Sequence, residues 1–267
     1  MANLHLNFRS DCLSRSVYPV VFLPDYTGWN ERKPPYPTLY FLPGYSGGGL
    51  ETATFTNFSL FSMVYGIAIV MVDGENSFYV DDEARGALFS QYVGREIVEV
   101  TRELLPLSRE RDETFIGGIS MGGYGALVNG LRFPRTFGKI AMLSPALELT
   151  NRDDQPTPGC PVPHGELLAT LGRWKQYEGT YKDVRHATQK ALEDPASMPE
   201  LFLTWGRQDG LVGESCRRYA SELREAGAPF ALYEAEGGHD HTFWKRAMTP
   251  CCQFLTGKGG EAACISG

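Results

Sequence analysis

A glycine-rich turn around Ser120 constrains this chain more than any other stretch of its sequence. Residues 115–119 form an apolar run of strand length, and residues 124–131 have the composition of a helix. The turn between them carries glycine at positions 118, 122 and 123. Glycine has no side chain to block close contact between a helix and a strand, and it relieves the strain of a sharp turn. The segment therefore predicts a strand, a tight turn and a helix, with the Ser120 hydroxyl at the apex.

Other short apolar segments predict the rest of a sheet. Those after residue 38 are short and almost continuously apolar, and they alternate with stretches that have helical spacing, whereas the first two alternate or cluster their apolar residues. Such strands are typical of a mostly parallel sheet covered by helices on both faces. The expected strands are residues 39–42, 66–72, 139–143, 201–205 and 230–233, with two more at 4–9 and 17–23. We therefore assign the chain to the α/β class.

Helices are expected between these strands at residues 52–65, 95–105, 214–226 and 242–255. In residues 95–105 the apolar positions 97, 100, 104 and 105 share one helical face, and Pro106 ends the segment. A proline inside a helix removes one backbone hydrogen bond. We therefore expect Pro250 to interrupt the last helix.

The chain has the size of one α/β domain. Its 267 residues, 42% of them hydrophobic, are sufficient for a large core. Residues 146–199 break the alternation of strands and helices and contain prolines at 156, 158, 161 and 163. We expect one domain over residues 1–267, with residues 146–199 as a cap-like insertion beside the site.

Charge and hydropathy limit the partners. The net charge is −7, and no block of basic residues stands out, so the chain lacks the basic footprint that nucleic-acid binding needs. The longest apolar runs, such as residues 67–72, are too short to span a bilayer. The first residues lack the basic start and apolar stretch of a signal peptide, so we expect a cytoplasmic protein. Homo-oligomerisation stays open.

The cysteine pattern does not favour a metal or redox site. The chain has six cysteines, and no two have the Cys-x-x-Cys spacing. We expect free thiols, several of them buried. The cysteines are Cys12, Cys160, Cys216, Cys251, Cys252 and Cys264.

The turn at Ser120 has the Gly-x-Ser-x-Gly pattern of a nucleophile elbow. A serine hydroxyl needs a base within hydrogen-bond reach, and the base needs a carboxylate to orient it. In α/β-hydrolases these groups follow in the order Ser, Asp or Glu, His, each after a strand. Asp209 follows the expected strand 201–205, and His239 follows 230–233. We therefore expect Ser120, Asp209 and His239 to form a catalytic triad.

Other histidines compete for the role of base. His239 is favoured because Gly237 and Gly238 give its loop backbone freedom, and His241 is better placed to begin the last helix. A metal site at His239-Asp240-His241 is a rival interpretation, but an obvious third ligand is missing. The remaining histidines, His5, His164 and His186, lie in an early strand or in the insertion, where structural or surface roles are expected.

Asp194 and Asp240 compete with Asp209 for the role of acid. Asp194 precedes its strand and so lies at the wrong end of the sheet, while Asp240 adjoins the base in sequence and is poorly placed to face its ring. The tetrahedral oxyanion needs two backbone donors. We expect these to be the N–H groups of Met121, directly after the nucleophile, and Tyr45, in the loop after strand 39–42.

Four sequence blocks resemble the esterase D / tributyrin esterase family, which includes S-formylglutathione hydrolases and relatives of feruloyl and acetylxylan esterases. The blocks are residues 39–47 (LYFLPGYSG), 73–79 (DGENSFY), 118–126 (GISMGGYGA) and 238–240 (GHD), and the resemblance extends over roughly residues 3–255. It implies an α/β-hydrolase with no cofactor and the same triad and oxyanion donors. It also places residues 73–79 near the acyl or alcohol pocket.

The sequence departs from this family at two positions. Pro43 stands where the family often has histidine, and His241 where tryptophan commonly follows His-Asp. Either change can reshape the pocket without removing the chemistry. The expected function is a serine carboxylesterase for small, short-acyl esters. The alternatives are a feruloyl- or acetylxylan-type esterase acting on acylated saccharides, an S-formylglutathione hydrolase, an acyltransferase using the same site, and a non-catalytic binding protein.

Overall fold

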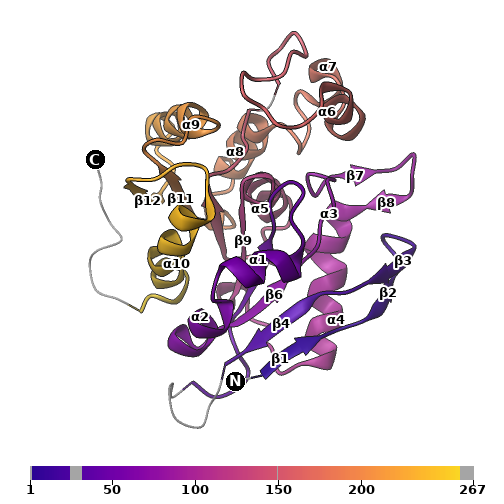
Figure 1. Ribbon diagram of the computed structural model, residues 1–267, viewed down its shortest axis with the longest axis vertical. Coiled ribbons are helices and arrows are strands. Elements are labelled where there is room, and N and C mark those ends of the chain that lie inside the picture. The colour runs from indigo at the N-terminus through magenta and orange to yellow at the C-terminus, as the bar shows by residue number, and fades with distance from the viewer. Residues whose placement is uncertain (1, 25–31, 149, 259–267) are drawn as a thin grey trace.

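The protein is built on one eight-stranded sheet (Figure 1). The computed structural model describes residues 2–24, 32–148 and 150–258. In spatial order the strands are β1 (Ala2–His5), β4 (Val20–Leu23), β6 (Ala68–Met71), β5 (Thr38–Leu42), β9 (Thr114–Ile119), β10 (Lys139–Leu143), β11 (Glu200–Gly206) and β12 (Phe230–Ala235). All neighbours from β6 to β12 are parallel, while β4 is antiparallel to both β1 and β6. The predicted α/β class with a mostly parallel sheet is confirmed.

The central strands are apolar on both faces because both faces are covered. In β5, Tyr40 and Leu42 belong to one core cluster, while Leu39 and Phe41 belong to the other. The first cluster includes side chains of α4 (Ile97–Leu104), α5 (Met121–Arg132), α8 (Val184–Leu192) and α9 (Gly213–Glu225). The second includes side chains of α2 (Phe58–Tyr65) and α10 (His241–Thr256). This two-sided burial explains why the strands are uniformly apolar in sequence.

Two predicted helices have a different form in the structure. The stretch expected to be one helix over residues 52–65 is α1 (Gly49–Phe55) and α2. They separate at Asn57, whose side chain accepts a hydrogen bond from Leu60 N–H and so caps α2. The other helix, α4, is preceded by α3 (Phe89–Gln91) and a π-helical turn, η1 (Tyr92–Glu96).

The prediction that Pro250 interrupts the last helix is wrong. Helix α10 runs without a break from His241 to Thr256, with Pro250 inside it. A proline at such a position costs about 3 kcal/mol relative to alanine. Its neighbours Ala247, Met248, Cys251 and Cys252 are all buried against the sheet. Packing of this apolar face offsets the missing backbone hydrogen bond.

The insertion between β10 and β11 holds three helices joined by long loops. It contains α6 (His164–Leu171), α7 (Trp174–Tyr177) and α8. Figure 1 shows α6 and α7 at the upper edge of the molecule, while α8 lies closer to α5. Leu167 and Leu171 of α6 are buried in the larger core cluster, so α6 is anchored to the rest of the chain.

Short elements complete the fold. The ribbons β2 (Phe8–Ser10) with β3 (Arg15–Val17) and β7 (Asp81–Asp82) with β8 (Ala87–Leu88) pair apart from the main sheet, and η2 (Arg111–Glu113) is a 3-10 turn. Within residues 2–24, 32–148 and 150–258, no helix combines the length and apolar character that a membrane span requires. Five of the cysteines are free thiols, and Cys264 lies outside the described residues.

Candidate active site

Ser120 stands at the sharp turn between β9 and α5. Its backbone has φ 55° and ψ −113°, a conformation that a non-glycine residue adopts only when its surroundings hold it there. Three hydrogen bonds do so: Ser120 N–H donates to Leu143 O at 2.9 Å, and Ser120 O accepts from the N–H groups of Tyr124 and Ala146 at 3.1 and 3.0 Å. The turn thus carries the strain that the sequence predicted.

The glycines of the turn are required by contact as well as by flexibility. A Cβ on Gly122 would overlap the carbonyl group of Leu42 at the end of β5. A Cβ on Gly118 would lie 2.6 Å from the same Leu42 oxygen. Both contacts would be closer than any normal one, so only glycine lets α5 start this close to β5 and β9. This close approach brings Ser120 next to the loop that follows β5.

His239 reaches Ser120 from the loop after β12. Its Nε2 lies 2.9 Å from Ser120 Oγ, a hydrogen-bond distance. The loop turns at Gly237, where φ is 144° and a Cβ would lie 2.9 Å from Phe243 Cβ. Asp240 then caps α10 by accepting a hydrogen bond from Phe243 N–H at 2.9 Å. The glycine turn on one side and the helix cap on the other fix the position of His239.

Asp209 lies on the far side of the His239 ring. Its Oδ2 is 2.8 Å from His239 Nδ1, and Oδ1 accepts from Leu211 N–H at 3.1 Å and Val212 N–H at 3.0 Å. Burial raises the pKa of this carboxyl, but the hydrogen bonds from His239, Val212 and Leu211 outweigh burial, so the pKa of Asp209 is lowered overall. The group is therefore a buried carboxylate that accepts from three donors.

The three residues predicted for the triad therefore meet in one hydrogen-bonded chain, Ser120, His239 and Asp209. The competing aspartates do not contact the imidazole: Asp194 bonds Ser197, and Asp240 caps α10. His241 begins α10 and stacks on Phe55 with ring centroids 4.3 Å apart, as expected of a helix start rather than of the base. In the described part of the chain, no cluster of three or more His, Cys, Asp or Glu has the arrangement of a metal site.

The expected oxyanion donors lie on either side of Ser120. Met121 is the first residue of α5, where backbone N–H groups have no partner within the helix. The loop of Tyr45 is close by, because a Cβ on Gly44 would lie 3.6 Å from the Cβ of Ser120. Among the described residues, neither the Met121 nor the Tyr45 N–H has a hydrogen-bond partner. Both donors are thus available to an anionic oxygen.

Tyr79 supports the loop before Tyr45. It is fully buried, and its hydroxyl donates to Pro43 O at 2.9 Å. Its ring occupies space left by two glycines, because a Cβ on Gly74 or Gly125 would run into the ring. The residue itself has a φ of 57°. Pro43, a departure from the family pattern, therefore contributes a carbonyl group that Tyr79 holds in place.

Trp244 packs on the base from α10. Its indole meets the His239 ring edge to face, with centroids 5.0 Å apart, and its Nε1–H donates to Ser144 Oγ at 3.1 Å. The sequence prediction missed Trp244 and Tyr79. Trp244 could have been found from its place five residues after His239, in the first turn of the predicted helix. The only sequence signal for Tyr79 was its place in the block 73–79.

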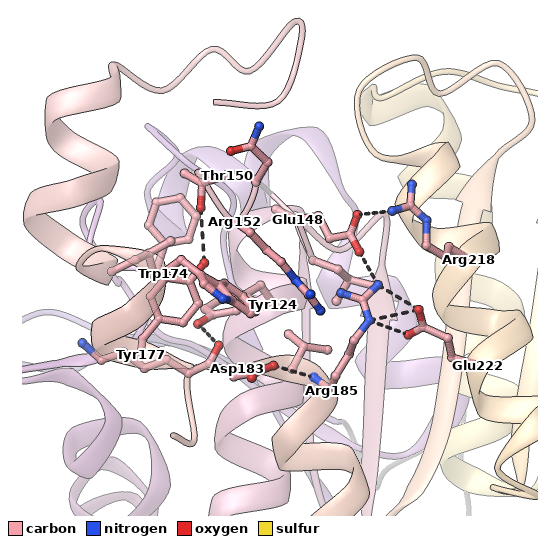
Figure 2. A pocket seen from close by; sticks show the side chains of 17 residues that line it. Tyr124, Glu148, Thr150, Arg152, Trp174, Tyr177, Asp183, Arg185, Arg218 and Glu222 are labelled. Carbon is pink, nitrogen blue, oxygen red and sulfur yellow. Dashed lines mark hydrogen bonds and ion pairs between the residues drawn. The ribbon is translucent and has the colours of Figure 1, made fainter. Parts of the chain in front are cut away.

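A cavity of about 360 Å³ is lined largely by residues of the insertion (Figure 2). Ser120 is not among its lining residues, but Ala146, which lines it, donates its N–H to Ser120 O. One wall is aromatic, made by Phe78, Tyr124, Trp174 and Tyr177. The opposite wall is charged: Arg185 pairs with Glu148 and Glu222, and Arg218 pairs with Glu148. Figure 2 shows Arg152 extending into the space between the two walls.

The chain matches the family model described as "Putative esterase" over residues 10–255. It is 33% identical over 273 residues to an acetyl esterase from Caldicellulosiruptor saccharolyticus, an alignment that covers 96% of this chain and 98% of that protein.

Two solved structures from Staphylococcus aureus share the fold over nearly the whole chain. Fluorophosphonate-binding serine hydrolase F, with substrate bound, superposes with a TM-score of 0.83 at 25% identity, covering 96% of this chain and 98% of that one. An S-formylglutathione hydrolase superposes with a TM-score of 0.81 at 26% identity and the same coverage. These likenesses agree with the resemblance that the four sequence blocks indicated.

Proposed function

This chain belongs to the esterase family whose model it matches and is a carboxylic ester hydrolase, and we propose that Ser120, His239 and Asp209 carry out its reaction on small esters with short acyl chains. The observation that carries the proposal is the position of one imidazole. Its Nε2 lies 2.9 Å from Ser120 Oγ while its Nδ1 lies 2.8 Å from Asp209 Oδ2. This is the arrangement in which a serine hydroxyl becomes a nucleophile at neutral pH.

Acylation begins when Ser120 Oγ attacks the ester carbonyl carbon and His239 Nε2 takes the hydroxyl proton. Asp209 accepts the Nδ1–H hydrogen bond, which keeps the other nitrogen free as the base and stabilises the imidazolium that forms. Because hydrogen bonds already keep Asp209 ionised, the negative charge is present before the proton moves. The tetrahedral intermediate then collapses, the carbon–oxygen bond to the alcohol breaks, and His239 gives the proton to the departing oxygen.

In this proposal the negative oxygen of that intermediate accepts hydrogen bonds from the N–H groups of Met121 and Tyr45. Removing one such donor typically costs about 3 kcal/mol of transition-state stabilisation. Deacylation repeats the sequence with water: His239 takes a proton from water, the hydroxide adds to the acyl carbonyl, and Ser120 leaves with the proton from His239. No cofactor is needed in either half of the reaction.

The relative and the cavity support the proposed substrate class. A relative that is 33% identical over nearly the whole chain is an acetyl esterase, which supports short acyl groups. The volume of about 360 Å³, lined in part by Ala146, suits a small molecule. Leu171, Trp174 and Tyr177 bring part of the cavity wall from residues 146–199. We therefore assign this segment the role of a cap within a single domain.

The test is Ser120→Ala with p-nitrophenyl acetate as substrate. We expect loss of turnover to the background rate with an unchanged unfolding temperature. Ser221→Ala, which alters an exposed serine on α9, is the matched control and should retain full activity. A panel of esters that varies acyl length and alcohol then defines the substrate. Wild-type activity in Ser120→Ala would refute the assignment of the nucleophile.

A further inference from the structure

Tyr45 lies in the loop after β5, and its side chain contacts the cap, residues 146–199. Its hydroxyl donates to Glu166 Oε2 on α6 at 2.8 Å. The two residues are 121 positions apart in sequence. On the way, the Tyr45 ring packs against Phe78 with centroids 6.5 Å apart. One hydrogen bond therefore joins the cap to the residue whose N–H is the proposed second oxyanion donor.

The phenol is suited to remain the donor in this bond. Burial raises the pKa of Tyr45, and the hydrogen bond to Glu166 and the charge of that carboxylate raise it further. The hydroxyl is therefore protonated throughout the pH range in which an esterase is assayed. Hydrogen bonds that involve an ionised partner are stronger than neutral ones.

Glu166 lies on a helix that is anchored in the core. It lies in the first turn of α6, and the next residue, Leu167, has 0% of its surface exposed. Leu171, one turn further, is also buried. Because these side chains anchor α6 in the main core, the carboxylate of Glu166 provides a fixed point rather than a mobile surface charge.

The loop that carries Tyr45 needs such a fixed point. It has glycine at positions 44, 47, 48 and 49, which give the backbone many alternative conformations. Tyr79 holds the carbonyl of Pro43 on one side, and the side chain of Asn76 accepts from Ser46 N–H at 2.9 Å on the other. Tyr45 lies between these two contacts, and its own side chain bonds it to the rest of the protein.

We propose that Glu166 is a positioning residue for ester hydrolysis, which holds the Tyr45 N–H toward the oxyanion through the Tyr45 hydroxyl. The inference rests on the proposed function, because it takes that N–H as an oxyanion donor. An oxyanion donor contributes only while it points at the developing charge, so a loose loop loses part of its effect. The cap thereby acts on the rate as well as on the shape of the cavity.

The experiment compares Glu166→Ala, Glu166→Gln, Tyr45→Phe and the double variant Tyr45→Phe/Glu166→Ala with p-nitrophenyl acetate. We expect Glu166→Ala to lower kcat about 5- to 30-fold, a part of the 10²- to 10³-fold effect of a whole donor, with KM changed less than about twofold. Glu166→Gln should restore most of kcat, because its amide oxygen can still accept. The double variant should be no slower than Glu166→Ala, since both substitutions break the same bond.

A second readout separates positioning from mere structural support. A trifluoromethyl ketone binds serine hydrolases as a tetrahedral adduct with a negative oxygen, so its inhibition constant should rise in Glu166→Ala by the factor by which kcat/KM falls. Glu178→Ala removes an exposed acidic side chain of the same insertion and should match the wild type in every measurement.

The inference is wrong if Glu166→Ala keeps kcat within twofold of wild type, if only its unfolding temperature falls, or if the effects of the two substitutions multiply. If Glu166→Ala does not fold, Tyr45→Phe carries the same test, because it removes the hydroxyl and keeps the backbone N–H. Ser120→Ala separates failure of this inference from failure of the proposed function. If Ser120→Ala loses activity while Glu166→Ala is unaffected, the proposed function stands and only the role of Glu166 is wrong.

Discussion

The indole of Trp244 meets the imidazole of His239 edge to face, with ring centroids 5.0 Å apart and planes at 86°. The indole is in turn tied to Ser144, whose hydroxyl accepts its N–H at 3.1 Å in a buried setting. Ser144 directly follows β10, so the contact connects the proposed base to an inner strand of the sheet. Packing of neighbouring side chains against a catalytic group is as necessary to its geometry as the hydrogen bonds that the group makes.

Ser144→Ala tests this support. The substitution leaves the buried indole N–H without a partner, which costs about 1–3 kcal/mol. We expect the free energy of unfolding, measured by urea denaturation, to fall by that amount, while kcat stays within a few-fold of the wild type because His239 keeps both of its hydrogen bonds. An unchanged stability would mean that the Trp244–Ser144 hydrogen bond contributes nothing.

Tyr79→Phe tests the support of the loop after β5. Without its hydroxyl, the Pro43 carbonyl loses a buried donor, so we expect about 1–2 kcal/mol less stability and a several-fold lower kcat. Tyr65→Phe is the matched control, because within the described part of the chain the Tyr65 hydroxyl makes only a long contact of 3.5 Å with Thr249 O. Equal effects of the two substitutions on stability and kcat would contradict the role of Tyr79.

Gly122→Ala tests the close contact between α5 and β5. The added methyl group would overlap the Leu42 carbonyl, which is backbone at the end of a central strand and cannot give way. We expect a loss of about 3 kcal/mol or more, or failure to fold. Gly165→Ala, on α6 with open space around the new methyl group, should be neutral or up to about 1 kcal/mol more stable. A folded, stable Gly122→Ala variant would show that the contact is not tight.

The pH dependence of stability tests the state of Asp209. Its pKa is lowered in the folded protein, so its ionisation adds stability above the unfolded pKa of about 3.9, and this contribution is lost as the pH falls through the folded value. We therefore expect the stability difference between the wild type and Asp209→Asn to shrink between about pH 5 and pH 2. Asp153→Asn, at an exposed position, should show no such trend. A constant difference for Asp209→Asn would contradict the lowered pKa.

The sequence was sufficient to predict the positions of Ser120, Asp209 and His239, because each follows a recognisable strand and parallel strands end at one edge of a sheet. It could not predict Glu166 or the packing of Trp244, since these contacts depend on how the cap and α10 settle on the sheet. Pro250 shows that tertiary packing can also override a feature that the sequence predicts. Local preference predicted a break there, whereas packing of the buried face keeps the helix continuous.

Element boundaries differed for a related reason. The two N-terminal strands expected at 4–9 and 17–23 are four short strands, because β2 and β3 pair with each other rather than with the sheet. The split of residues 52–65 into α1 and α2 depends on the Asn57 cap, a signal present in the sequence.

The most direct test of the central claim is to identify the covalent intermediate. The protein is mixed with p-nitrophenyl acetate, quenched in acid during turnover, digested and analysed by mass spectrometry. We predict an acetyl group on the peptide that contains Ser120 and specifically on that residue, absent from Ser120→Ala treated in the same way. Rapid turnover with no acetylated peptide, or with the acetyl group on a different residue, would contradict the account.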